Sequence, residues 1–247
     1  MEKIIIHGQR PLRGEVEING SKNAAVAILP AALLANDVVI LENVPDIADI
    51  KNLIQIMREM QVKVDRIDSH TLRIDSRHMI NDCANSESVR KMRASYYLLG
   101  VLLGRFKNAR VAFPGGCDFG VRPIDLHVKG FEALGATVTI ENGCNVVTAG
   151  PNGLHGASVY LDIASVGATI NVMLAAVMAK GRTTIDNAAR EPHIVDLANF
   201  LNTMGARISG AGTDTVKIRG VESLHGGTYA IIPDQIEAGT YLAAVAA

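Results

Sequence analysis

An internal repeat constrains the fold of this chain more than any other feature of its sequence. Each repeat opens with small residues that lead into a strongly apolar helix: SKNAAVAILPAALLA from Ser21, VRKMRASYYLLGVLLG from Val89 and ASVGATINVMLAAVMAKG from Ala164. A short β-like segment follows, and then an amphipathic helix led by proline, at Pro45, Pro123 and Pro192. Alternating segments such as HTLRID and DTVKIRG close the repeats as strands. The period is about 70 residues, longer than that of the common solenoid repeats.

This order of strand, helix, strand, helix, strand, strand, written three times, predicts an α/β protein. Helices that are apolar nearly all round, such as Ile170–Ala179, must be buried on every side, so we expect them at the centre with sheets outside. Gly135 and Gly205 follow proline-led helices where a left-handed residue is favoured, and Gln61 takes that place in the first repeat. We expect similar units related by approximate threefold symmetry, near residues 21–88, 89–163 and 164–230.

Composition narrows the class of protein and the range of partners. The net charge of −1 gives no global basic field, and the absence of tryptophan argues against a base-stacking surface, so nothing favours nucleic acid. Three widely spaced cysteines, an odd number, fit a reducing compartment and exclude a simple zinc pattern. The N-terminus has no signal-peptide architecture, and the apolar run Ala24–Ala35 is too short to cross a bilayer and contains Pro30. We therefore expect a cytoplasmic protein with no membrane partner.

The segment Phe113–His127, FPGGCDFGVRPIDLH, carries the main chemical signal. Its adjacent glycines predict an exposed loop with Cys117 at the tip. Arg122 follows closely, and the proline and aspartate after it suit the first turn of a helix, where anions bind. A lone cysteine is usually a small apolar filler, but a buried cysteine needs no flexible loop around it. Because a thiol near positive charge ionises readily, the segment predicts a reactive cysteine beside an anion site.

The stretch PGGCDFGVRPIDLH resembles the active-site loop of the UDP-N-acetylglucosamine enolpyruvyl transferases (UDP-N-acetylglucosamine 1-carboxyvinyltransferases). That family makes the first committed precursor of bacterial peptidoglycan. The resemblance implies an inside-out α/β prism of repeated βαβαββ units with pseudo-threefold symmetry. It implies a complete middle domain at residues 21–230, whereas residues 1–20 and 231–247 would be fragments of a second, catalytic domain. We therefore expect the chain to be truncated, and we expect no metal and no cofactor.

The resemblance also implies a two-step reaction. The 3′-hydroxyl of UDP-N-acetylglucosamine adds to C2 of phosphoenolpyruvate while C3 is protonated, and phosphate then leaves while C3 loses a proton. Cys117 matches the family cysteine that protonates C3 and is alkylated by fosfomycin. Lys22 matches the phosphoenolpyruvate lysine, and Asn23 a sugar-contacting asparagine. Arg122 matches a phosphate and phosphoenolpyruvate contact, and Arg93 a second basic contact.

Two further segments match substrate-binding parts of the family. The uridine-holding segment corresponds to Pro123, Ile124, Asp125 and Leu126, and the diphosphate turn to Ser165, Val166 and Gly167. Without the family match, each of these sets has an ordinary interpretation. Lys22 and Asn23 would be a polar helix start, and Arg93 and Arg122 would be solvated surface arginines. The turn at Ser165–Gly167 would be an N-cap before a core helix. His127 lies in the same region without an assigned role. Departures from other members, which resemble the second paralogue of low-GC Gram-positive bacteria, stand at Tyr97, Ile163 and Ala48.

Two alternatives stay open at this point. The sister family of 5-enolpyruvylshikimate-3-phosphate synthases shares the fold and the carboxyvinyl chemistry, but it lacks the PGGC loop, so Cys117 counts against it. The second alternative is a non-catalytic remnant that binds UDP-sugar or a partner. Because the family's base candidate and several arginines would lie in the missing half, we expect little or no turnover from this chain alone.

Overall fold

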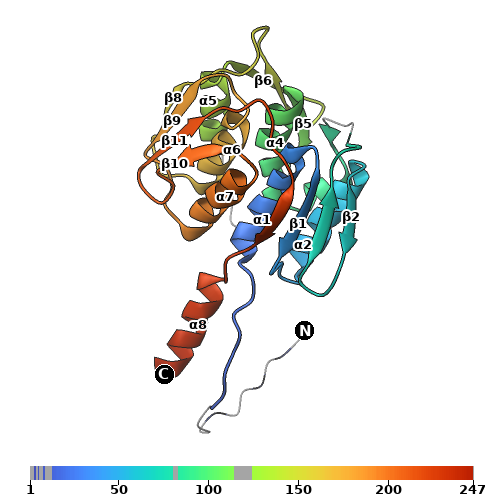
Figure 1. Ribbon diagram of the computed structural model, residues 1–247, viewed down its shortest axis with the longest axis vertical. Helices are drawn as coiled ribbons and strands as arrows, with labels where there is room; N and C mark the ends of the chain where they lie inside the picture. The colour runs from blue at the N-terminus through green and yellow to red at the C-terminus, as the bar shows by residue number, and fades with distance from the viewer. Residues whose placement is uncertain are drawn as a thin grey trace.

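The computed structural model describes residues 13–79, 83–113 and 124–246, together with Lys3, Ile5 and Gly8. Three four-stranded sheets lie around a bundle of helices (Figure 1). The first has the order β12–β1–β3–β2, with strands Gly227–Ala230, Val38–Glu42, Leu72–Asp75 and Lys63–Arg66. The second has the order β4–β5–β7–β6, with strands Cys83–Ala84, Asn108–Ala112, Cys144–Ala149 and Ala136–Glu141. The third has the order β8–β9–β11–β10, with strands Ser158–Tyr160, Arg182–Asp186, Thr215–Arg219 and Arg207–Ser209.

The three sheets share one design. In each, an edge strand (β12, β4 or β8) pairs in parallel with the strand that follows a central helix (β1, β5 or β9). Two antiparallel strands complete the sheet. Because β12 comes late in the chain and pairs with β1, the third unit closes onto the first. The predicted threefold repeat of βαβαββ units is therefore confirmed.

One helix of each unit is central and apolar. These helices are α1 (Lys22–Ala31, continued by a 3-10 turn at Ala32–Ala35), α4 (Tyr97–Phe106) and α6 (Val166–Ala176). Every side chain from Ala24 to Ala35 and from Ala168 to Ala176 is buried, as predicted. Two glycines let α4 approach α6: a Cβ added at Gly100 would lie 2.5 Å from the carbonyl oxygen of Asn171, and one at Gly104 would lie 2.9 Å from that of Leu174.

The second helix of each unit packs beside the central ones: α2 (Ala48–Glu59), α5 (Asp125–Ala133) and α7 (Pro192–Thr203). The left-handed residues after them are confirmed, with φ of 64° at Gln61, 88° at Gly135 and 101° at Gly205. The proline start is right for Pro192 but wrong for Pro45. Ile47 has extended backbone and its N–H donates to the carbonyl of Pro45, so Pro45 lies in a turn before the helix.

The apolar helix predicted from Val89 is interrupted. Helix α3 (Glu87–Arg90) ends before an extended residue, Met92, and a 3-10 turn, η2 (Arg93–Tyr96), then leads into α4. The hydroxyl of Ser95 donates to the carbonyl oxygen of Val89 at 3.1 Å and so satisfies a group that a continuous helix would have bonded. The interruption leaves Arg93 at the N-terminal end of α4.

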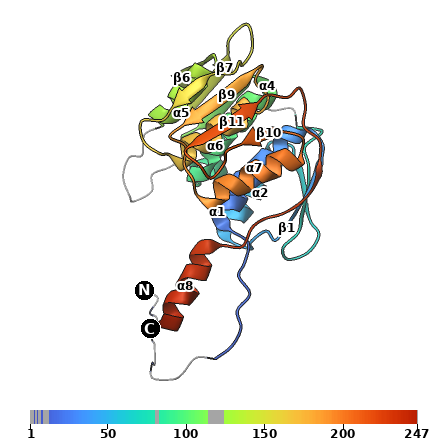
Figure 2. The same ribbon diagram turned by 60° about the vertical axis from the view of Figure 1, so that its left-hand side comes forward.

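Helix α8 (Gln235–Ala246) stands apart from the sheets and central helices in both views (Figure 2). Its sequence predicts a buried helix, yet every side chain it presents is wholly or partly exposed, including Leu242 at 70% and Val245 at 86%. No described segment packs over this helix. Among the described residues, no helix combines the length and apolar character needed to cross a bilayer.

Candidate active site

The N-termini of the helices gather at one end of the bundle. The ammonium of Lys22 in the first turn of α1 pairs with Asp49 in the first turn of α2, at 2.6 Å. His127 in the first turn of α5 lies against Gly167 in the first turn of α6. Such termini carry partial positive charge and free N–H groups, so this end of the bundle suits anions.

Lys22 and Asn23 begin α1, at the α1–α2 side of this end. The hydroxyl of Ser21 caps the helix by accepting from the N–H of Ala24 at 3.4 Å. The side chains of Lys22 and Asp49 are 53% and 42% exposed. An ion pair so open to water is held weakly, so the ammonium is accessible to a competing anion. Asn23 follows on the same turn and is half-buried.

Asp234 links the starts of two helices and was not singled out from the sequence. One carboxylate oxygen accepts from the N–H of Lys22 at 3.0 Å, and the other accepts from Ile236 and Glu237 at the start of α8. The carboxylate of Glu237 in turn accepts from the backbone N–H of Asn19 at 3.0 Å. The sequence signal was an aspartate three residues before a glutamate, the pattern of a helix N-terminus.

His127 is buried at this end of the bundle and is hydrogen-bonded to a neighbouring helix. Its side chain is 8% exposed, and its Nδ1 lies 3.0 Å from Nδ2 of Asn171. The Asn171 amide has its orientation set by Gly100, whose N–H donates to Oδ1 at 2.9 Å. Nδ2 therefore donates to Nδ1, and the proton of neutral His127 is on Nε2. A Cβ added at Gly167 would lie 2.9 Å from Nε2, so this donor faces the turn that begins α6.

Burial lowers the pKa of His127 to about 4, and the nearby charge of Arg93 acts in the same direction, while Asp125 opposes it. The imidazole is therefore neutral at pH 7. Arg93 is half-buried in η2, and within the described ranges no carboxylate forms an ion pair with it. An arginine in this setting has unused donors for a ligand anion.

The turn at Ser165–Gly167 begins α6. The hydroxyl of Ser165 accepts from the N–H of Ala168 at 3.3 Å, which leaves the N–H groups of Val166 and Gly167 directed outward from the helix start. Ile124 caps α5 without a side-chain hydrogen bond, and Asp125 and Leu126 form its first turn. Close approach of the two helices requires glycine, because a Cβ at Gly130 would lie 2.2 Å from Cγ2 of Val172.

The structure thus brings two groups of predicted residues to one end of the bundle. Arg93, Ile124–Leu126 and Ser165–Gly167 surround the α5–α6 junction, and Lys22 with Asn23 begins α1. Cys117, Arg122 and Pro123 lie outside the described residues, so their roles stay predictions. Sequence reasoning missed Asn171, which was visible as the single amide side chain of the mostly apolar α6. It also missed Asp49, because a carboxylate in the first turn of a helix is common and gives no special signal.

Two cysteines lie within the described residues, and one of them, Cys144, is fully buried. Cys83 is half-buried in β4. Because Cys144 is buried, it is a poor target for alkylation. That Cys117 is the most reactive thiol stays a prediction.

Comparison with known proteins agrees with this architecture. The chain is 56% identical over its whole length to UDP-N-acetylglucosamine 1-carboxyvinyltransferase 2 of Clostridium acetobutylicum and 55% identical to UDP-N-acetylglucosamine 1-carboxyvinyltransferase of Streptococcus pneumoniae. It spans 59% of the length of each of these relatives. The predicted resemblance, including that to second paralogues, is confirmed.

Solved structures support the fold. The enolpyruvyl transferase NikO from Streptomyces tendae superimposes with a TM-score of 0.82 at 27% identity, over 97% of this chain and 56% of that one. EPSP synthase from Acinetobacter baumannii gives a TM-score of 0.67 at 19% identity, over 89% of this chain and 50% of that one. The family model for EPSP synthase (3-phosphoshikimate 1-carboxyvinyltransferase) matches residues 6–247. The chain belongs to the family that this model describes, and within it the relatives at 55–56% identity are UDP-N-acetylglucosamine 1-carboxyvinyltransferases.

Proposed function

We propose that this chain carries the UDP-sugar-binding and cysteine-bearing part of an enolpyruvyl transferase. The reaction moves the 1-carboxyvinyl group of phosphoenolpyruvate to the 3′-hydroxyl of UDP-N-acetylglucosamine and releases phosphate. Peptidoglycan synthesis in the cytoplasm is part of the same proposal. The names of the relatives at 55–56% identity support this substrate pair, although the chain spans only 59% of their length.

The observation that carries the proposal is the gathering of helix N-termini with Lys22 and Arg93 at one end of the bundle. Both proposed substrates are anions, one a diphosphate and the other a phosphate and carboxylate. Backbone N–H groups at Val166 and Gly167 suit the diphosphate, with the guanidinium of Arg93 close to the same junction. Neutral His127 would add an Nε2–H donor there without titrating at physiological pH.

The remaining roles follow the reaction. Ile124, Asp125 and Leu126, with Pro123, would hold the uridine, and Asn23 would contact the sugar. In the addition step the 3′-hydroxyl loses its proton to the base that would lie in the missing half, its oxygen bonds to C2 of phosphoenolpyruvate, and Cys117 gives a proton to C3 as the C2–C3 double bond becomes single. In the second step the C2–O bond to phosphate breaks and C3 loses a proton, with Lys22 and Arg122 holding the departing charge.

A direct binding experiment tests the proposed site. UDP-N-acetylglucosamine should bind the 247-residue chain in a calorimetric titration. We expect Arg93→Gln to weaken binding about tenfold, because a charge-assisted contact to phosphate is lost. Arg90→Gln is the matched control, since Arg90 lies three residues earlier, is exposed, and donates from its guanidinium to Asn85. Equal affinities of Arg93→Gln and wild type would contradict the site.

A second measurement separates transfer from binding alone. Phosphate release from phosphoenolpyruvate is followed with and without UDP-N-acetylglucosamine, with Cys117→Ala as the blank. Release that needs both substrates and is lost in the blank would assign turnover to this chain itself. Binding without release would favour the non-catalytic alternative for the chain alone.

A further inference from the structure

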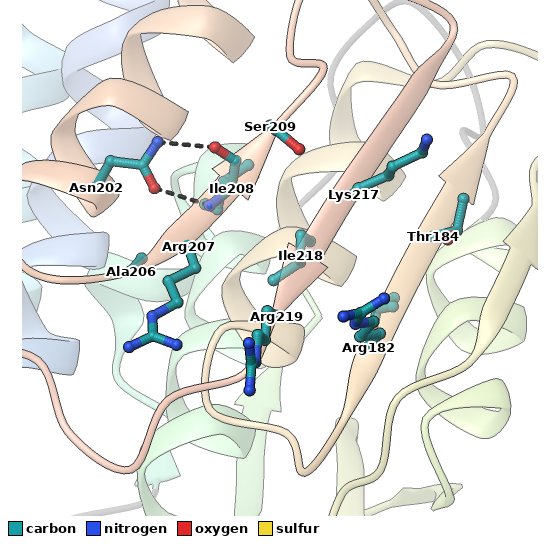
Figure 3. A pocket seen from close by; sticks show the side chains of 11 residues that line it. Arg182, Thr184, Asn202, Ala206, Arg207, Ile208, Ser209, Lys217, Ile218 and Arg219 are labelled. Atoms are coloured by element: carbon teal, nitrogen blue, oxygen red, sulfur yellow. Dashed lines mark hydrogen bonds between the residues drawn. The ribbon is translucent and has the colours of Figure 1, made fainter.

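The outward face of the third sheet carries three arginines side by side. Arg182, Arg207 and Arg219 lie on β9, β10 and β11, and the strand register places Arg219 directly opposite each of the other two. All three are exposed, and we call them the arginine row. Lys217 is two residues before Arg219 on β11 and therefore shares this outward face (Figure 3). Val216 and Ile218, which alternate with Lys217 and Arg219 along β11, are buried in the core.

The corresponding positions of the other two sheets are neutral or paired. In the first sheet the same row holds Lys63, Asp75 and Val38, and in the second it holds Thr137, Thr148 and Asn108. The first-sheet charges are compensated by ion pairs such as Lys63–Asp65 and Arg77–Asp75. In the second sheet Arg110 on the outward face pairs with Glu141 at 2.7 Å. Within the described ranges, no ion pair joins the arginine row or Lys217 to a carboxylate.

An uncompensated row of this kind costs stability. Like charges directly opposite each other on neighbouring strands destabilise a sheet. The repeat shows that the fold does not demand arginine at these positions, because the equivalent residues of the other sheets include valine, threonine and asparagine. A bound anion would convert the repulsion into attraction, since guanidinium groups bind phosphate through paired hydrogen bonds.

The arginine row lies in a groove across the sheet. Its volume is about 710 Å³, and its lining comes from β9, β10, β11 and the end of α7. This volume is within the range of sites for small ligands. None of the lining residues is aromatic, so the groove offers no surface for stacking a base. Asn202 also lines the groove, and its side-chain amide is hydrogen-bonded to both the N–H and the carbonyl of Ile208 (Figure 3).

We propose that this groove binds a compact ligand carrying two or three linked phosphate groups. The three guanidinium groups stand on adjacent strands, so the row spans about 10 Å, which suits a short chain of phosphates better than a single phosphate ion. Recognition rests on charge and on the fork geometry of arginine rather than on a base or sugar. The site is independent of the proposed transferase function, because it uses none of the residues assigned to that function.

Titration of the 247-residue chain with tripolyphosphate tests the proposal, at low ionic strength and at 0.15 M salt. We expect saturable binding, with amide chemical shifts in β9–β11 responding first. Arg219→Gln should weaken binding at least about tenfold, since it removes the middle of the row. It should also raise the melting temperature of the ligand-free protein, because the repulsion is relieved.

The repeat supplies a matched control. Arg207→Gln and Lys63→Gln remove the same charge from equivalent edge-strand positions of the third and first sheets, and only Arg207→Gln should weaken binding. Arg90→Gln, an exposed arginine on α3 outside both proposed sites, should leave tripolyphosphate affinity for the groove unchanged. Unaltered affinity in Arg219→Gln would overturn the proposal, as would equal losses in Arg207→Gln and Lys63→Gln. Tighter binding of an oligouridylate of equal charge would also overturn it, because that result assigns the face to single-stranded nucleic acid.

Discussion

Two junctions at the same end of the bundle hold helix N-termini together by different means. At the α1–α2 junction, Lys22 and Asp49 form an ion pair that is about half exposed to water. At the α5–α6 junction, His127 and Asn171 form a buried hydrogen-bond network that reaches Gly100 on α4. The junctions occupy different places in the repeat, since α1 and α2 belong to one unit whereas α5 is the second helix of the second unit and α6 is the central helix of the third.

An anion site needs a cation that can move toward the ligand and a donor that is fixed in place, and the two junctions supply one of these each. A solvated ammonium keeps its charge and its freedom to move toward a ligand, and it contributes little to stability. A buried network fixes one geometry, but each of its polar groups becomes costly to leave without a partner. The α1–α2 junction thus presents a mobile cation, whereas the α5–α6 junction presents a fixed, neutral donor.

The largest effect should come from breaking the buried network. Asn171→Ala leaves the N–H of Gly100 and Nδ1 of His127 without their side-chain partner in the core. We expect the free energy of unfolding to fall by about 2–4 kcal/mol, measured by urea denaturation at pH 7.

Asn202→Ala is the matched control for that variant. Asn202 also makes two hydrogen bonds to backbone, both with Ile208, but its side chain is exposed and water can replace it. Its loss should cost about 1 kcal/mol or less. Equal losses in the two variants would show that burial does not distinguish the two sites.

An intermediate effect should come from protonating His127. The pKa of its imidazole is about 4 in the folded protein against 6.5 for the unperturbed group. Below pH 6.5 the unfolded chain therefore binds a proton that the folded protein does not. The resulting loss of stability grows as the pH falls from about 6.5 to about 4, reaches about 3 kcal/mol, and then levels off.

The measurement is the difference in unfolding free energy between wild type and His127→Gln as a function of pH. Other titrating groups, including His193 with its pKa also lowered by burial, are common to both proteins and largely cancel. The advantage of wild type over His127→Gln should shrink as the pH falls through this window. A difference that stays constant from pH 7 to pH 4 would mean that His127 is not held neutral.

Much of this architecture could be predicted from the sequence because each unit repeats the same order of apolar helices and alternating strands. The burial of α6 follows from a helix with apolar residues on all sides, and the left-handed Gln61 follows from its place after a helix that aligns with two others ending in glycine. The interruption at Met92 could not be predicted, since the apolar pattern runs on through it and the local hydrogen bond from Ser95 to Val89 leaves no mark on that pattern. The exposure of α8 does not follow from its hydropathy, because hydropathy reports what a helix prefers and not what packs over it.

The candidate site was predictable only where a motif identified it. Arg93 and the turn at Ser165–Gly167 have ordinary local patterns, and the family resemblance singled them out. The network of His127, Asn171 and Gly100 was missed because its members are far apart in sequence and meet only through the close approach of α4, α5 and α6. A polar residue inside an apolar helix was its one local signal.

The smallest effect should come from the exposed junction. Lys22→Ala removes an ion pair whose charges are both solvated, so we expect the free energy of unfolding to change by less than about 1 kcal/mol. Asp49→Ala and the double variant complete a thermodynamic cycle, whose coupling energy should be about 0.2–1 kcal/mol and should shrink in 1 M salt. The comparison of junctions holds if this coupling is several times smaller than the loss in Asn171→Ala. A coupling as large as that loss would show that the Lys22–Asp49 pair is shielded from water. The ammonium would then be held in place at the helix start and would not be a mobile cation.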